Sequence, residues 1–153
     1  MSNQSELNRT KAQIDAAMRQ IKRQWNAVAS NVAQEAGKNL VTGGAYSPGT
    51  PRDTGFAQSA WQAMINGSVL SGRNKQKAVL GSRSQGVKGV SYQPAVLLLG
   101  NVKAGDRVSF SNYASYIELL EYGSSNQAPN GMIGLTAAAM PLIVAAEIAK
   151  VFK

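Results

Sequence analysis

Apolar residues recur every three or four positions through the first quarter of the chain, with Gln, Lys and Arg between them. This spacing predicts a long amphipathic helix. We expect it to occupy residues 1–37, with Ser5 as the N-cap and Gly37 as the stop. The strict alternation of threes and fours predicts lengthwise packing against a helix or sheet, and we favour a partner inside the chain over one outside it. The apolar positions are Leu7, Ile14, Met18, Ile21, Trp25, Val28 and Val32.

A second helix is predicted after a loop rich in Gly, Pro, Ser and Thr. It would run from Gly55 to Ile65, with Asp53 or Thr54 as its cap, and Asn66-Gly67 would end it. Phe56 and Trp61 lie on the face that would dock on the core.

The middle of the chain favours strands. Residues 68–92 alternate short apolar runs with polar, basic and glycine-rich pieces, which predicts a basic hairpin or arm. Residues 92–100 and 107–111 are further strand candidates, with a turn at 103–106.

Two helical patterns follow, at 112–122 and at 131–153. Gly123 would end the first, and Pro141 would break the second. The sequence therefore predicts one α+β domain over residues 1–153, in which a long N-terminal and a C-terminal helix flank a small, mostly antiparallel sheet.

Composition removes most catalytic chemistry. The chain has no cysteine and no histidine, so thiol nucleophiles, imidazole bases and the commonest zinc ligands are missing. We expect no enzyme activity, no cofactor and no metal. The polar start of the chain lacks the apolar core of a signal peptide, and the apolar run 132–144 is too short and broken to span a bilayer, so we expect no membrane partner.

Three patterns invite a chemical interpretation. Asp53-Thr54-Gly55 has the letters of an aspartic protease motif, but a capped helix start explains them better. Glu118 and Glu121 could bind a metal or cleave glycosides, but they have no neighbouring carboxylates in sequence, and an acidic patch is favoured. The glycine-rich pieces lack the Gly-Lys-Ser/Thr ending of a phosphate loop.

The net charge of +8 is concentrated. Residues 73–107 hold seven basic residues against one acid, Asp106. Such a cluster indicates a polyanion, an acidic partner surface or only a soluble loop. Within the arm, the candidate contacts with DNA or with a neighbouring ring are Arg73, Lys75, Lys77, Arg83 and Lys88.

Two segments together carry a family resemblance. Residues 50–61, with Asp53-Thr54-Gly55 and then Ser59-Ala60-Trp61, are similar to the first signature of the tail-completion (neck) proteins of long-tailed bacteriophages. Residues 112–129 resemble the second, with the motif positions Tyr113, Tyr116, Glu118, Tyr122 and Gly123. Phe56, the extra Leu119-Leu120 and Gly131-Met132-Ile133 depart from the family pattern.

The resemblance implies a structural virion protein. Its subunits would form a ring, expected to be a hexamer, that joins the tail to the head connector as a tail-terminator-like neck protein. The implied partners are further copies, adjacent connector and tail-tube proteins, and the genomic double-stranded DNA that passes through. It would be assembled in the host cytoplasm and found in the virion. The motif residues would be structural, with Asp53 as a helix cap and the aromatics packed together. A basic nucleic-acid-binding domain is the alternative.

Overall fold

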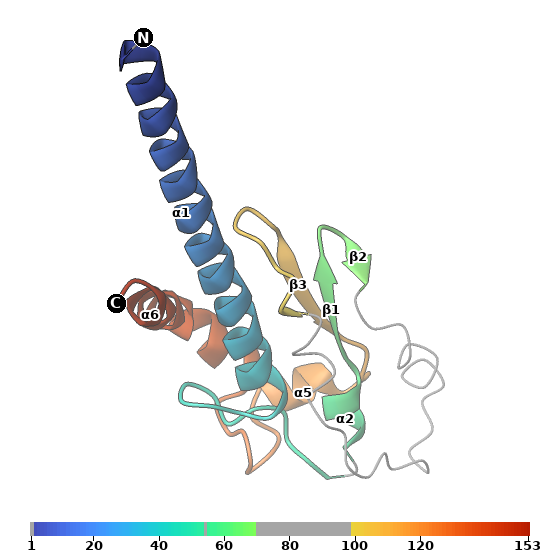
Figure 1. Cartoon of the computed structure of the whole chain (residues 1–153). Coiled ribbons are helices and arrows are strands. Elements are labelled where there is room, and N and C mark those ends of the chain that lie inside the picture. Colours follow the sequence, from blue (N-terminus) through green and yellow to red (C-terminus); the bar gives the residue numbers. More distant parts are fainter. Residues whose placement is uncertain (1, 54, 70–98) are drawn as a thin grey trace.

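The computed structural model describes residues 2–53, 55–69 and 99–153, and it confirms the α+β fold. The helix α1 (Ser2–Val41) has 40 residues, which corresponds to a length of about 60 Å. Its N-terminal half projects beyond the other described elements, and its C-terminal half lies between the sheet and the helix α6 (Figure 1). The long helix is therefore both the centre of the fold and an arm that extends from it.

Both predicted ends of this helix are wrong. Ser5 lies inside α1, and Gly37 is buried within the helix instead of ending it. The helix ends four residues later, where the N–H groups of Thr42 and Gly43 both donate to the Lys38 carbonyl, at 2.9 and 3.0 Å. Gly43 has φ 87°, the left-handed conformation that closes a helix.

The sheet has three antiparallel strands in the order β2-β1-β3. They are β1 (Trp61–Ile65), β2 (Ser68–Val69) and β3 (Val108–Asn112). Ala63 of β1 pairs with Phe110 of β3. The face of the sheet that carries Ala63 packs on α1 through a core of Ala33, Ala63, Leu99 and Val102. The sheet thus covers one side of the C-terminal half of α1.

The helix predicted from Gly55 to Ile65 is wrong over most of its length. The helix α2 (Phe56–Ser59) is a single turn, and the chain then continues as β1. Asn66 and Gly67 have φ 51° and 82°, so they form a two-residue hairpin turn between β1 and β2.

Two helices complete the fold. The helix α5 (Ile117–Glu121) is shorter than the predicted 112–122, because Asn112 belongs to β3. The helix α6 (Ile133–Val151) packs on α1 and runs through Pro141 without the predicted break. Pro141 and Ala137 are both exposed, so the carbonyl that lacks a helical donor can bond to water.

By length and composition α6 could also cross a membrane, with a mean hydropathy of 1.5. The sequence interpretation considered only the apolar run 132–144 as a membrane span, whereas α6 as a whole meets the criteria. Helices of soluble proteins meet the same criteria, and this one holds Glu147, which is buried and bonded to Lys150.

Most of the predicted basic arm, residues 68–92, lies outside the described residues. Only Ser68 and Val69 are described, as β2. The five basic residues Arg73, Lys75, Lys77, Arg83 and Lys88, the motif residue Thr54, and most of the strand predicted at 92–100 all lie outside them.

Candidate assembly surfaces

The two motif segments, residues 50–61 and 112–129, form one unit, although residues 62–111 separate them in the chain. The backbone N–H of Arg52 donates to Oε1 of Gln127 at 2.9 Å, and Nε2 of Gln127 donates back to the Arg52 carbonyl at 3.2 Å. Nδ2 of Asn112 donates to the Ala57 carbonyl at 2.8 Å. The resemblance was based on two separate stretches, and the fold brings them together.

Aromatic side chains fill the junction between the segments. Buried Ala57, Ala60 and Ala114 form its centre, and partly buried Phe56, Tyr113 and Tyr116 pack around them. The Phe56 and Tyr116 rings lie 6.2 Å apart. We predicted that these aromatics would hold the segments together, and this packing agrees with that prediction.

Trp61 lies where the two motif segments meet, because it pairs with Asn112 in the sheet. It is partly buried in β1, and its Nε1–H donates to Oγ1 of Thr50 at 2.7 Å. The Thr50 hydroxyl in turn donates to the Leu40 carbonyl at 2.7 Å. Trp61 therefore connects the first motif to the end of α1.

Asp53 is not a helix cap. It is exposed, and the residue at the N-cap of α2 is Gly55, with φ 81° and no side-chain cap. A carboxylate does cap a helix elsewhere, since Glu121 accepts the backbone N–H groups of Met132, Ile133 and Gly134 at 2.9, 2.8 and 2.8 Å.

The cap on α6 changes the acidity of Glu121. Partial burial raises the pKa of its carboxyl, but the three backbone N–H donors outweigh burial and hold the pKa below its ordinary value. Gly131 permits the contact, because a Cβ there would lie 2.4 Å from the Glu121 carbonyl oxygen. The sequence interpretation missed this cap, which joins residues eleven to thirteen positions apart.

The rest of the second motif divides into outward and structural positions. Glu118, Leu119 and Tyr122 are exposed, and Tyr122 is 86% exposed. Gly123 has φ 83°, and a Cβ there would lie 2.3 Å from the Pro129 carbonyl oxygen. Glu118 and Glu121 therefore do not form a pair, because Glu118 faces solvent and Glu121 caps α6. The described residues contain no group of three or more potential metal ligands.

The apolar seam of α1 is only half covered. Val28 is buried and Val32 is partly buried, as packing within the chain requires. The ring of Trp25 meets that of Phe152, 5.2 Å away at the end of α6. Toward the N-terminus the seam lies on the projecting arm, and its large side chains expose between 44% and 64% of their surface. We call these residues the stripe: Leu7, Ile14, Met18, Ile21 and Trp25.

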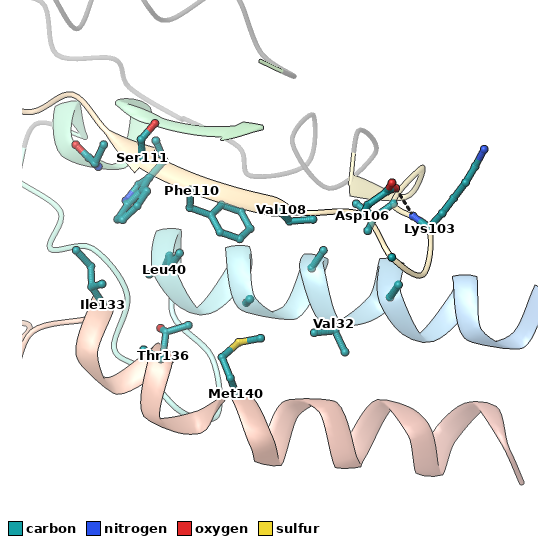
Figure 2. A pocket seen from close by; sticks show the side chains of 18 of the residues that line it. Val32, Leu40, Lys103, Asp106, Val108, Phe110, Ser111, Ile133, Thr136 and Met140 are labelled. Atoms are coloured by element: carbon teal, nitrogen blue, oxygen red, sulfur yellow. Dashed lines mark hydrogen bonds between the residues drawn. The ribbon is translucent and has the colours of Figure 1, made fainter. Parts of the chain in front are cut away.

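An apolar groove of about 580 Å³ lies along the C-terminal half of α1. In Figure 2, Val108 and Phe110 point from β3 toward α1, and Thr136 and Met140 point from α6 toward the same helix. We call this site the groove. Its wall on α1 is formed mainly by small residues, and the lining positions on the two helices are Ala29, Val32, Ala33, Ala36, Leu40, Ile133, Thr136, Ala137 and Met140.

Charge is divided between the arm and the rest of the described chain. Residues 2–25 carry five basic and two acidic side chains. The described residues from 26 onward carry six of each. The stripe therefore lies on a positively charged arm. The described residues from 26 onward have no net charge, and residues 70–98, outside the described part, add five basic side chains and no acidic one.

Comparison with protein-family models, with curated proteins and with solved structures finds no match.

Proposed function

We propose that this chain is a structural protein of a tailed bacteriophage. In this proposal it forms a ring at the neck, as a tail-completion or tail-terminator-like subunit, and joins the tail to the head connector while DNA passes through. The virion is its place of action, and its partners are its own copies and the adjacent connector and tail-tube proteins.

The observation that carries the assembly role is the exposed stripe on the projecting half of α1. Large apolar side chains at heptad spacing are costly to leave in water, and contiguous patches of this kind mark interaction sites. The resemblance of the two motif segments supports the phage assignment. Their junction through Arg52 and Gln127 makes them one surface, from which Leu119 and Tyr122 point outward.

Complementation of a phage that lacks this chain tests the proposal. Without the chain, we expect DNA-filled heads and free tails to accumulate unjoined, and purified wild-type chain added to the lysate should restore infectious particles. Complete, infectious particles made without the chain would contradict the proposal.

The alternative is a basic nucleic-acid-binding domain. The concentration of basic residues between 73 and 107 favours it, because Lys and Arg bind phosphates through release of counterions. Salt-dependent binding of a short DNA duplex by the free monomer would support this alternative. No binding at low salt would favour the neck role.

Charge reversal in the predicted basic arm, residues 68–92, separates two ways in which a neck protein could use its basic residues. Loss of joining with normal DNA retention would indicate contact with a neighbouring protein. Normal joining with leakage of DNA would indicate a channel lining. The residues to reverse are Lys75, Lys77, Arg83 and Lys88.

A further inference from the structure

We propose that the stripe of one copy docks in the groove of the next copy. The partner is thus a second copy of this chain, and the contact joins two different surfaces. The contact itself does not depend on the proposed function. Only the closure of such contacts into a ring does: a head-to-tail contact forms a ring when its repeated rotation brings the last copy back to the first.

Within the described residues, the stripe cannot cover the groove of its own chain. The stripe and one wall of the groove belong to the same continuous helix, α1. The stripe occupies residues 7–25 and the groove wall residues 29–40, so the stripe cannot turn back into its own groove while the helix stays intact. An arm of 24 residues, about 36 Å long, can instead reach a neighbour.

The groove has the properties of a receptor for a helix. Its lining is mainly apolar, and the small side chain of the partly buried Ala29 leaves room beside α1. Apolar side chains at three- and four-residue spacing are the usual anchors when an amphipathic helix binds such a groove. Met18, Ile21 and Trp25 have this spacing.

The surface involved is enough for a weak contact that a ring reinforces. Five large side chains that each expose roughly half their surface give an apolar patch on the order of 500 Å². The groove lining exposes less than half as much surface, so one contact would bury less than about 1,000 Å², below the usual range for stable specific interfaces. Single contacts should therefore form at high protein concentration, and closure of a ring should stabilise them together.

Charge favours this arrangement over pairing of two stripes. Each arm carries an excess of three positive charges, and Lys11 occupies a position of the stripe's own heptad pattern. Pairing two arms would bring these like charges together, whereas the lining of the groove holds one basic and one acidic residue, Lys103 and Asp106, and adds no excess of like charge at the contact.

The test uses two variants and a matched control, each first checked for native circular dichroism. The stripe variant carries Ile14→Gln, Met18→Gln and Ile21→Gln. The groove variant carries Ala137→Trp, which fills the groove from an exposed position of α6. The control is Leu142→Gln, an aliphatic residue of α6 that is as exposed as the stripe, at 59%, and does not line the groove.

Light scattering after size exclusion gives the mass as a function of concentration. We expect wild type and the control to associate as concentration rises, and each variant alone to stay monomeric. An equimolar mixture of the two variants should form a heterodimer and nothing larger, because it holds one intact stripe and one intact groove. A groove variant that associates like wild type would show that stripes pair with each other and would overturn the inference. So would a wild type that is monomeric throughout.

Cross-linking keeps the test decisive if Ala137→Trp does not fold. The chain has no cysteine, so Met18→Cys and Ala137→Cys proteins each hold a single thiol. Under mild oxidation the mixture should give a disulfide-linked heterodimer in large excess over either homodimer, and absence of that excess would overturn the inference. Complementation then separates the two proposals: a chain that docks by stripe and groove but does not restore joining contradicts only the neck function.

Discussion

Replacement of Glu121 by Gln tests the connection between the second motif and α6. The Glu121 carboxylate accepts three backbone N–H groups at 2.8 to 2.9 Å at the start of a 19-residue helix. Gln keeps one acceptor oxygen, loses the charge, and turns an NH₂ group toward at least one donor. Hydrogen bonds to charged groups contribute about 1.5–3 kcal/mol each, and the favourable interaction with the helix dipole adds about 0.3–1 kcal/mol.

We expect Glu121→Gln to lower the free energy of unfolding by about 2–3 kcal/mol at pH 7. For a chain of this length that corresponds to a decrease in Tm of roughly 4–12 °C. Urea unfolding followed by circular dichroism measures the change. The matched control is Glu118→Gln on the same helix, where the side chain is exposed, and it should change stability by less than about 0.5 kcal/mol.

The difference between wild type and Glu121→Gln should depend on pH. The folded pKa of Glu121 is lower than its ordinary value of 4.5, so the stabilisation is complete above the unfolded pKa and is lost as pH falls through the folded pKa. The difference between the two proteins should therefore begin to shrink as pH falls below 4.5 and should disappear only below the folded pKa of Glu121. A Glu121→Gln protein as stable as Glu118→Gln at pH 7, or a difference that does not shrink in acid, would refute the capping role.

Three further substitutions test other parts of the fold. Trp61→Ala should cost about 3 kcal/mol, since it removes a partly buried ring and the bond to Thr50, and Trp61→Phe should cost less; equal effects would contradict the role of the ring. Gln62→Met should raise stability by about 1 kcal/mol, because both polar side-chain atoms of Gln62 are buried without a hydrogen-bond partner among the described residues; a loss would show that the amide is satisfied. Gly123→Ala should cost about 2 kcal/mol more than Gly67→Ala, because both glycines have φ near 82° but only Gly123 faces a carbonyl at contact distance; equal costs would exclude the contact.

The parts of the fold that depend on local periodicity could be predicted from the sequence. The seam of α1 identified a long helix, and the short run Val108–Phe110 identified β3. The segment Trp61–Ile65 was assigned wrongly, because Ala63 is buried against α1 while Gln62 is buried on the other face, and a strand buried on both faces shows no alternation. Asn66-Gly67 was the available signal, since this pair favours a hairpin turn.

Tertiary contacts account for the remaining differences. Gly37 stays helical because it is buried inside α1, and the stop comes only where Gly43 adopts a positive φ. The Glu121 cap depends on the fold of the loop that leads to Gly131, which no local pattern specifies. No local pattern distinguishes the covered part of the seam, from Val28 onward, from the exposed part before it, because one heptad pattern continues through both halves.

Electron microscopy of phage particles assembled with this chain tests the proposed neck function most directly. A compact tag fused at the N-terminus of α1, which projects from the body, would locate the subunit in averaged images (Figure 1). We predict a ring of tag density at the junction of head and tail, in particles that still join and infect. Joined, infectious particles with no tag density at that junction would contradict the account.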